Sequence, residues 1–471
     1  MLSTELAVVG GGPGGYAAAF LAADLGLQVA LIDPEVNPGG VCVYRGCIPS
    51  KTLLHVAKLV SEARHATAWG LDFAEPKIDL DKLRSFKNGV VNRLTSGTGQ
   101  LVTHRRVQYL QGLAEILDAH TLRVALKKGG EERIQFGHAI LATGSRPAAV
   151  PGLTIESHRV WDSTRALELP AIPKTLLVVG GGYIGLELGS VYAALGAEVT
   201  VVEMTSGLLP GADRDLVDVL AKRLAKTLRG ILLDTRVGQM SETPHGMHVS
   251  LDGRSSGPEQ IFENVLVAVG RKPNSNIPGI ERTTVQTDPR GFIVVDDQRR
   301  THEPSIFAIG DVVGDPMLAH KASHEGRIAV EVIVGENVAF EPRAIPAVVF
   351  TDPEVAWCGL TESQAASKSR AVAIAKFPWA ASGRAISIDR TDGLTKLLLD
   401  PDTGRVLGVG LVGSGAGELI AEGVLAIEMG ATASDMQLAI HPHPTLTETM
   451  MESAEVFFGQ ATHVFRPRRR A

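Results

Sequence analysis

The sequence predicts an α/β protein in which two doubly wound units are followed by a smaller α+β domain. Three observations support this prediction. A strand, turn, helix and strand pattern occurs twice, in residues 6–33 and 176–203; short apolar segments ending in glycine turns follow; and the last part of the chain has no glycine-rich loop. At about 150 residues per domain, the 471 residues correspond to about three domains.

The two copies of the pattern are identical at 11 of 28 positions without a gap. Each has an apolar segment, a G-x-G-x-x-G turn, a run of small and apolar residues and a second apolar segment. The first glycine of such a turn allows the tight bend, the second lets a pyrophosphate approach the backbone, and the third lets helix and strand pack together. We therefore expect two Rossmann-like dinucleotide-binding domains, with these glycines at Gly10, Gly12, Gly15, Gly180, Gly182 and Gly185.

A carboxylate ends each copy, 23 residues after its first glycine. Asp33 and Glu203 are placed to accept hydrogen bonds from an adenosine ribose. Two dinucleotide sites in one chain favour electron transfer between two different dinucleotides, FAD at the first site and a nicotinamide at the second. Glu203 favours NAD over NADP, because a carboxylate accepts a hydrogen bond from a free 2′-hydroxyl but repels a 2′-phosphate.

Three later apolar segments set the predicted domain boundaries. Residues 138–147 and 264–274 read as strands that close the two units, and residues 305–314 as a strand that returns to the first unit. A helix is predicted over residues 416–430. We expect four consecutive parts: an FAD-binding domain over 1–147, an NAD-binding domain over 148–275, the rest of the FAD-binding domain over 276–345, and a third domain over 346–471.

Composition and charge exclude several classes of protein. The net charge of -6 argues against a nucleic-acid partner, and the basic segment 466–471 reads as a solvated end. Residues 6–23 are uncharged over a length that suits a membrane span, but clustered Gly and Pro divide them into strand, turn and helix, so no membrane association is expected. Three cysteines cannot form a secreted disulfide framework and no leader pattern is present, so we expect a cytoplasmic protein.

Cys42 and Cys47 lie in the segment GGVCVYRGCIPSK, residues 39–51. A zinc site needs further ligands, and Cys358 is far away in the sequence and expected to be a buried apolar residue, so no metal site is predicted. A dithiol–disulfide couple and two structural cysteines remain as interpretations. The couple is favoured because residues 48–51 begin a predicted helix that lowers a thiol pKa, and because flavins exchange electron pairs with disulfides.

A second candidate lies near the end of the chain, in HPHPTLTE. His443 is followed by a proline and, five residues later, by Glu448, so a carboxylate can orient the imidazole. A dithiol substrate must lose a proton before it attacks a disulfide, and this pair suits that task. A histidine in such a position is more often structural, and the sequence leaves both interpretations open.

At these motifs the chain resembles the branch of the flavin-dependent pyridine nucleotide-disulfide oxidoreductase family that oxidises dihydrolipoyl groups. The similarity runs from residue 5 to about residue 458, and its most specific parts are GGVCVYRGCIPSK, GGGYIGLELG, FAIGDVVGDPMLAHKASHEG, VFTDPEVAWCGLTE and HPHPTLTE. The resemblance implies oxidation of protein-bound dihydrolipoamide to lipoamide with reduction of NAD. It also implies, as partners, the lipoyl domains of the acyltransferases of 2-oxo acid dehydrogenase complexes, or the lipoyl carrier of glycine cleavage.

The resemblance assigns catalytic roles to four residues. Cys42 would be the thiol that meets the substrate, and Cys47 the thiol beside the flavin. His443, oriented by Glu448, would be the acid–base group. It would serve the disulfide of the other subunit in a homodimer built by the third domain.

The resemblance also implies cofactor contacts. Lys51 would lie near the flavin N5, paired with Glu187 on the NAD side. Tyr183 would either swing as a lid over the NAD site or pack in place, and Gly270 would complete that site. The other implied FAD contacts are Gly112, Thr143, Gly144, Ser145, Asp311, Met317, Leu318, Ala319 and His320.

Some positions depart from the usual family pattern. Residues 43–46 read Val-Tyr-Arg-Gly, Asp33 stands where glutamate is frequent, and Pro442 stands where alanine is usual. We hypothesise that the charge of Arg45 lowers a thiol pKa; the alternative is a solvated side chain. Two alternative functions stay open: a glutathione-type disulfide reductase, which Glu203 disfavours, and a flavoprotein subunit with a mainly structural role.

Overall fold

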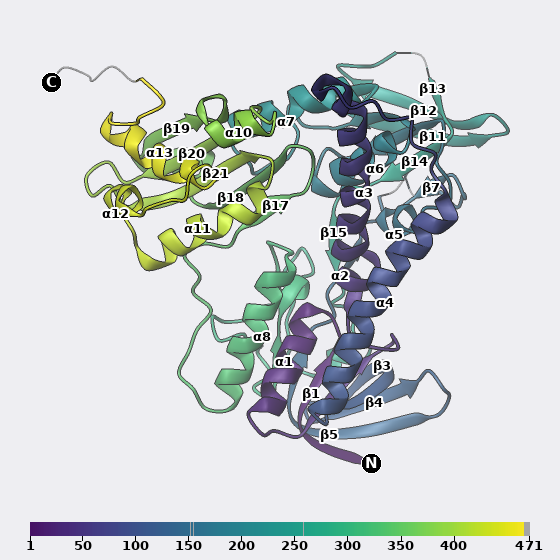
Figure 1. The fold of residues 1–471 in the computed structure, drawn as a ribbon. Coiled ribbons are helices and arrows are strands. Elements are labelled where there is room, and N and C mark those ends of the chain that lie inside the picture. Colours follow the sequence, from purple (N-terminus) through teal and green to yellow (C-terminus); the bar gives the residue numbers. More distant parts are fainter. Residues whose placement is uncertain (151, 154, 258, 466–471) are drawn as a thin grey trace.

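The structure is a computed structural model that describes residues 1–150, 152–153, 155–257 and 259–465. The basic segment 466–471, predicted to be a solvated end, lies outside the described residues. In Figure 1 the N-terminal unit lies at the bottom, the second unit at the upper right and the third domain at the upper left. Two long antiparallel helices, α3 (Cys47–His65) and α4 (Leu80–His104), run between the first two units.

The first unit is built on a six-stranded sheet. Five of its strands are parallel and lie in the order β3-β2-β1-β5-β16, while β4 pairs antiparallel with β3 and β5. Their bounds are β1 (Leu2–Val9), β2 (Val29–Asp33), β3 (Gln108–Asp118), β4 (Thr121–Leu126), β5 (Glu131–Leu141) and β16 (Ile306–Ala308). Two helices that pack against each other, α1 (Pro13–Asp24) and α8 (Ala319–Ile333), accompany this sheet, together with the short α2 (Gly40–Arg45).

The second unit repeats the strand order of the first except at one edge, where β7 precedes β8 in the chain, whereas β16 follows β5. Its parallel sheet runs β10-β9-β8-β14-β7, so the strand that precedes the glycine turn is central in both units. The strands are β7 (Val160–Trp161), β8 (Thr175–Val179), β9 (Glu198–Val202), β10 (Gly230–Leu232) and β14 (Asn264–Val267). Its helices are α5 (Ser163–Leu167), α6 (Tyr183–Ala194) and α7 (Arg214–Thr227).

Two smaller sheets complete the first two units. One is antiparallel and consists of β11 (Thr235–Thr243), β12 (Gly246–Gly253) and β13 (Gln260–Phe262). The other consists of β6 (Ser145–Pro147) and β15 (Arg271–Pro273). This pairing holds together the two segments through which the chain passes from one unit to the other. Single turns of 3-10 helix occur at η1 (Ala66–Trp69), η2 (Ile280–Arg282), η3 (Gly310–Val313) and η4 (Trp379–Ala381).

The third domain is an antiparallel sheet covered by helices. Its strand order is β17-β18-β21-β20-β19. The strands are β17 (Ala347–Val349), β18 (Glu354–Gly359), β19 (Ala373–Pro378), β20 (Leu394–Leu399) and β21 (Val406–Gly413). The helices are α9 (Glu362–Ser367), α10 (Gly383–Ser387), α11 (Ala416–Met429), α12 (Ala433–Leu438) and α13 (Glu448–Phe458), so the helix predicted over 416–430 is present.

The central parallel strands are buried on both faces, which explains their unbroken apolar sequences. All five residues of β2 and four of the five in β8 are buried, as expected for a parallel sheet covered by helices. The α/β prediction is therefore confirmed. The apolar stretch 6–23 forms the end of β1, the turn and most of α1, and no helix within the described residues is long and apolar enough to cross a membrane.

Candidate active site

The two neighbouring cysteines lie where two helices meet. Cys42 is in α2, and Cys47 is the first residue of α3, so Cys47 occupies the helix N-terminus that the sequence predicted. Gly46 joins the helices at a close approach, because a Cβ atom there would lie 2.8 Å from the carbonyl oxygen of Val41. Both cysteines are free thiols in this structure.

The two thiols differ in acidity. A hydrogen bond from Cys42 and the nearby ammonium of Lys51 lower the pKa of Cys47 to about 7, although burial opposes them. The hydrogen bond to Cys47 and burial raise the pKa of Cys42. Above about pH 7 the pair therefore carries its negative charge on Cys47 while Cys42 keeps its proton.

The Lys51 ammonium is held by a buried carboxylate from the second unit. Its Nζ lies 2.8 Å from Oε2 and 3.1 Å from Oε1 of Glu187. Glu187 lies on α6 and is only 3% exposed. The Ser50 hydroxyl donates to Glu187 Oε2 at 2.9 Å, and the Phe350 amide of the third domain donates to Oε1 at 3.0 Å. Glu187 thus joins three parts of the chain beside the cysteine pair.

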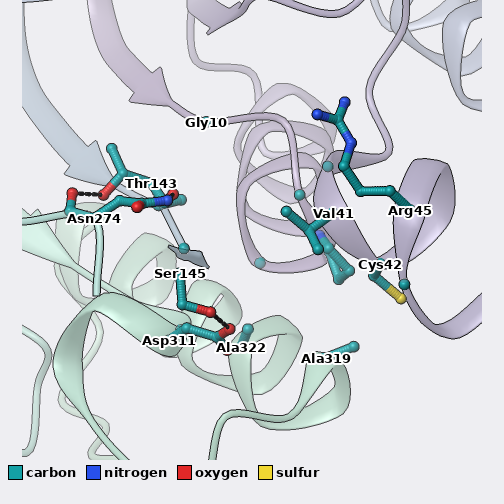
Figure 2. Close-up of a pocket in the computed structure, with 18 of the residues that line it drawn as sticks. Gly10, Val41, Cys42, Arg45, Thr143, Ser145, Asn274, Asp311, Ala319 and Ala322 are labelled. Atoms are coloured by element: carbon teal, nitrogen blue, oxygen red, sulfur yellow. Dashed lines mark hydrogen bonds between the residues drawn. The ribbon is translucent and has the colours of Figure 1, made fainter. Parts of the chain in front are cut away.

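The cysteines, Lys51 and Glu187 line one cavity of about 490 Å³. Figure 2 shows Val41, Cys42 and Arg45 on one side of this cavity and Thr143, Ser145 and Asp311 on the other. The cavity is lined by most of the predicted FAD contacts: Gly10, Gly12, Asp33, Lys51, Gly112, Thr143, Gly144, Ser145, Asp311, Met317 and Ala319.

Three predicted FAD contacts are outside the lining. Gly15 packs behind the turn, where a Cβ atom would lie 1.8 Å from the Gly10 carbonyl oxygen. Leu318 is the residue that precedes α8. His320 turns toward the connection to the third domain, and its Nε2 lies 2.8 Å from the Pro346 carbonyl oxygen.

The first glycine turn fits the pyrophosphate of a dinucleotide. Gly10 has φ +109°, and a Cβ atom there would meet the Ala142 carbonyl oxygen at 2.3 Å. Gly12 is different, because the nearest atom to a Cβ there is Cα of Gly40, at 3.9 Å. The first and third glycines are therefore required by the packing of the protein, whereas Gly12 keeps the backbone open to the cavity.

The carboxylate at the end of each repeat accepts a hydrogen bond from the glycine turn of the same repeat. Asp33 Oδ2 accepts from the Gly11 amide at 2.5 Å, and Glu203 Oε2 accepts from the Gly181 amide at 2.7 Å. Burial raises the pKa of Asp33, although the Gly11 amide lowers it. Because a carboxylate has about four lone-pair sites, both acids keep acceptor capacity for a ribose hydroxyl.

A series of hydrogen-bonded polar side chains lies on the other side of the cavity (Figure 2). The Ser145 hydroxyl donates to Asp311 Oδ2 at 2.5 Å, and Arg271 Nε donates to Ser145 Oγ at 2.7 Å. Asp311 lies in η3, whose Gly310 amide donates at 2.7 Å to the fully buried carboxylate of Glu325. The cavity therefore has a glycine cradle at one place and fixed hydroxyl and carboxylate groups at another, a donor set that fits FAD.

The second glycine turn has the same geometry as the first. Gly180 has φ +109°, a Cβ on Gly185 would lie 2.2 Å from the Gly180 carbonyl oxygen, and no atom lies within 4 Å of a Cβ on Gly182. Of the predicted NAD contacts, Tyr183 and Glu187 line the cavity. The others lie outside its lining: Gly180, Gly182, Gly185, Glu203 and Gly270.

The predicted acid–base pair is formed, but outside the cavity. His443 Nδ1 lies 2.9 Å from Glu448 Oε1, and the Thr445 amide donates to Glu448 Oε2 at 2.8 Å. Burial raises the pKa of Glu448, but these hydrogen bonds outweigh it and lower the pKa overall. The His443 side chain is 72% exposed, and neither residue is in the lining of the cavity.

Comparison with known protein families agrees with this arrangement. Residues 4–326 match the pyridine nucleotide-disulphide oxidoreductase family, and residues 345–454 match the dimerisation domain of the same family. The chain belongs to the pyridine nucleotide-disulphide oxidoreductases. It is an FAD- and NAD-dependent disulfide oxidoreductase, and its dimerisation domain supports a homodimer.

The sequence similarity to named proteins covers nearly the whole chain. The dihydrolipoyl dehydrogenase of Haemophilus influenzae is 48% identical over 98% of this chain and 96% of its own length, and that of Vibrio cholerae is 47% identical over 98% and 97%. Among solved structures, LpdA of Mycobacterium tuberculosis has a TM-score of 0.89 at 28% identity, covering 97% of this chain and 99% of its own. The HOCl-induced flavoprotein disulfide reductase RclA of Escherichia coli, in its Cu(II) complex, has a TM-score of 0.86 at 29% identity, covering 97% and 99%.

In this member of the family, Arg45 forms an ion pair away from the two thiols. Its guanidinium pairs with the Glu35 carboxylate, and its charge lowers the pKa of Asp33. Lys51 supplies the positive charge at the cysteines. The Arg45 side chain is 40% exposed, so it is also partly solvated, and an effect of its charge on a thiol stays a prediction.

Sequence reasoning also missed residues that support the site. Phe350 and Ser50 hold Glu187, and Arg271 holds Ser145. Phe350 lies in the family segment VFTDPEVAWCGLTE, and Arg271 lies in the predicted strand segment 264–274. No spacing rule connects either residue to the cysteine pair. Only the fold brings them together.

Proposed function

We propose that this chain is a dihydrolipoyl dehydrogenase, which oxidises protein-bound dihydrolipoamide and reduces NAD. The observation that carries the proposal is the pair of unequal thiols, Cys42 and Cys47, beside the Lys51–Glu187 ion pair at the junction of two dinucleotide turns. The relatives of that name, at 42–48% identity over 98% of the chain, support the choice of substrate. Glu203 supports NAD rather than NADP.

The proposal divides the cofactor contacts between the two turns. FAD would be held by residues of the cavity, namely Gly10, Gly12, Asp33, Lys51, Gly112, Thr143, Gly144, Ser145, Asp311, Met317 and Ala319. NAD would be held by Gly180, Gly182, Tyr183, Glu187, Glu203 and Gly270. We propose residues 1–147 with 276–345 as the FAD-binding domain, 148–275 as the NAD-binding domain and 346–471 as the domain that forms the dimer.

The chemistry at the cysteines follows from their acidity. In the oxidised enzyme His443 takes the proton of one substrate thiol, and the resulting thiolate attacks Cys42 Sγ. The Cys42–Cys47 bond breaks, and Cys47 leaves as the thiolate that its lowered pKa favours. The second substrate thiol then displaces Cys42 from the mixed disulfide and its proton passes to Cys42, whose pKa is raised, which closes the lipoamide ring. Bound FAD supplies the two-electron transfer from the dithiol to NAD.

The exposed imidazole of His443, paired with Glu448, supports an active site shared between subunits. An acid–base group outside the cavity of its own chain can act on the Cys42–Cys47 disulfide of a second copy, across the homodimer. The substrate would be a lipoyl domain of an acyltransferase or the lipoyl carrier of glycine cleavage. We further propose a cytoplasmic location, because three cysteines cannot form the disulfide framework of a secreted protein.

Anaerobic titration of the FAD-loaded protein with dihydrolipoamide tests the proposal. We expect a long-wavelength absorbance band from the Cys47 thiolate beside the flavin, and then NADH after addition of NAD but little NADPH after addition of NADP. The Cys47→Ser protein is the control and should give neither the band nor NADH.

Two results would contradict the proposal. Reduction of glutathione disulfide by NADPH, without oxidation of dihydrolipoamide, would indicate a glutathione-type reductase. No turnover with either substrate, despite bound FAD, would indicate a mainly structural subunit.

A further inference from the structure

Phe350 places the third domain in contact with the redox site. It follows β17, the first strand of the third domain's sheet. Its amide donates to Glu187 Oε1 at 3.0 Å, and the centroid of its ring lies 4.6 Å from Lys51 Nζ. One residue of the third domain thus contacts both members of the ion pair beside the cysteines.

These two contacts restrict the Lys51 ammonium from two directions. Glu187 is held by Lys51, by the Ser50 hydroxyl and by the Phe350 amide, so its carboxylate has a fixed orientation. On another side, the ammonium faces the aromatic ring, which attracts a cation through its negative face. The Lys51 side chain is 29% exposed, so water does not fully screen this attraction.

The position of this ammonium matters because Lys51 and Glu187 act on Cys47 in opposite senses. Lys51 lowers the pKa of Cys47, and Glu187 raises it. Any displacement of the ammonium away from the ring changes the balance between the two charges at the sulfur. The ring therefore affects the ionisation of Cys47, although Phe350 belongs to another domain.

We propose that Phe350 is a positioning residue, whose ring holds the Lys51 ammonium beside Cys47 and thereby couples the third domain to the redox chemistry. The proposal rests on the function proposed above, in which Cys47 acts as a thiolate. It concerns the ring alone, because the Phe350 amide is present whatever the side chain.

The test measures the ionisation of Cys47 directly. In the FAD-loaded Cys42→Ser protein no disulfide forms with Cys47, and the absorbance of its thiolate beside the flavin is followed against pH. Phe350→Leu removes the aromatic face, and we expect the midpoint to rise by about half to one pH unit. Phe350→Tyr keeps the face, and its midpoint should stay with that of the Cys42→Ser parent.

Two further variants separate the ring's effect from general destabilisation. Phe292→Leu removes another phenylalanine that faces a cation, Arg290 at 4.8 Å, and neither residue is in the lining of the cavity. Its midpoint should not move. In a Lys51→Met background, Phe350→Leu should give no additional shift, because the ring acts only through the ammonium. If Phe350→Leu does not fold, Phe350→Met replaces it, with similar volume and no aromatic face.

The outcomes are distinct for the two proposals. An unchanged midpoint in Phe350→Leu, an equal shift in Phe350→Tyr, or a further shift in the Lys51→Met background would overturn the positioning role. Oxidation of dihydrolipoamide by the otherwise unchanged protein tests the function separately. A shifted midpoint in a protein that does not oxidise dihydrolipoamide would keep Phe350's role and reject the substrate.

Discussion

At the scale of single residues, the charge state of Cys47 depends on two neighbours of opposite sign. Lys51→Met removes the positive charge and should raise the pKa of Cys47 by about one unit or more, whereas Glu187→Gln should lower it. The measurement is the pH dependence of alkylation of Cys47 in Cys42→Ser proteins, where the remaining Cys358 is 1% exposed. Shifts in the same direction in both variants would show that these charges do not control the thiol.

The His443–Glu448 pair gives a second prediction at this scale. His443→Gln removes the group that accepts the substrate proton and should lower kcat by about 10²–10⁴-fold. Glu448→Gln removes the charge that stabilises the imidazolium and should lower kcat by about tenfold or more, with KM for dihydrolipoamide nearly unchanged. The control Glu418→Gln, at an exposed position of α11, should keep full activity. Equal activity of Glu448→Gln and the control would remove Glu448 from the mechanism.

At the scale of elements, the glycines of each turn divide into packing and binding positions. Gly15→Ala places a Cβ atom against the Gly10 carbonyl oxygen and should prevent stable folding, because neither backbone can yield. Gly12→Ala meets no atom closer than 3.9 Å and should fold with normal thermal stability of the apoprotein, but bind FAD about tenfold or more weakly. Thermal melting and FAD titration check the pair. Normal FAD affinity in Gly12→Ala would refute the cradle.

The elements themselves were largely predictable, because a repeat carries the same physical pattern twice. Buried parallel strands need unbroken apolar sequences, and the turns need glycine, so β1, α1, β8 and α6 could be predicted from residues 6–33 and 176–203. Cys47 at the start of α3 was predictable for the same local reason. Contacts between distant segments were not predictable. The Phe350 ring meets Lys51 although the two residues are 299 positions apart in the sequence, and the partner of Arg45 depends on how α2 packs.

At the scale of the whole molecule, a buried ammonium joins the second unit to the third domain. Lys396 of β20 is fully buried, and its Nζ lies 2.6 Å from Asp213, 2.7 Å from Asp215 and 2.8 Å from Glu362. Burial lowers the pKa of Lys396, but the three carboxylates outweigh it and raise the pKa overall. The ammonium stands between carboxylates that otherwise have the spacing of metal ligands.

Lys396→Met should therefore destabilise the protein by about 3–5 kcal/mol, because it leaves the buried carboxylate of Asp213 without its cation, while Lys376 still pairs with Asp215 and Glu362. The sign of the pH effect follows from the raised pKa: the stabilisation by Lys396 is complete below the unfolded-state value and is lost as the pH rises through the folded-state value. Denaturant unfolding measures both effects. A Lys396→Met protein as stable as the parent would show that the cluster does not join the two parts.

The division of the active site between subunits gives a prediction that only a dimer can satisfy. Cys42→Ser and His443→Gln proteins should each be nearly inactive alone. A mixed dimer of the two has one site in which both groups are intact, if His443 serves the partner's cysteines, and so should recover about half the activity of the normal dimer. If His443 serves its own chain, each site of the mixed dimer lacks one group and no activity returns. Co-expression with two different affinity tags isolates the mixed dimer, and NADH formation from dihydrolipoamide measures its activity. Recovery would assign the exposed imidazole, 72% accessible in one chain, to the cavity of the other.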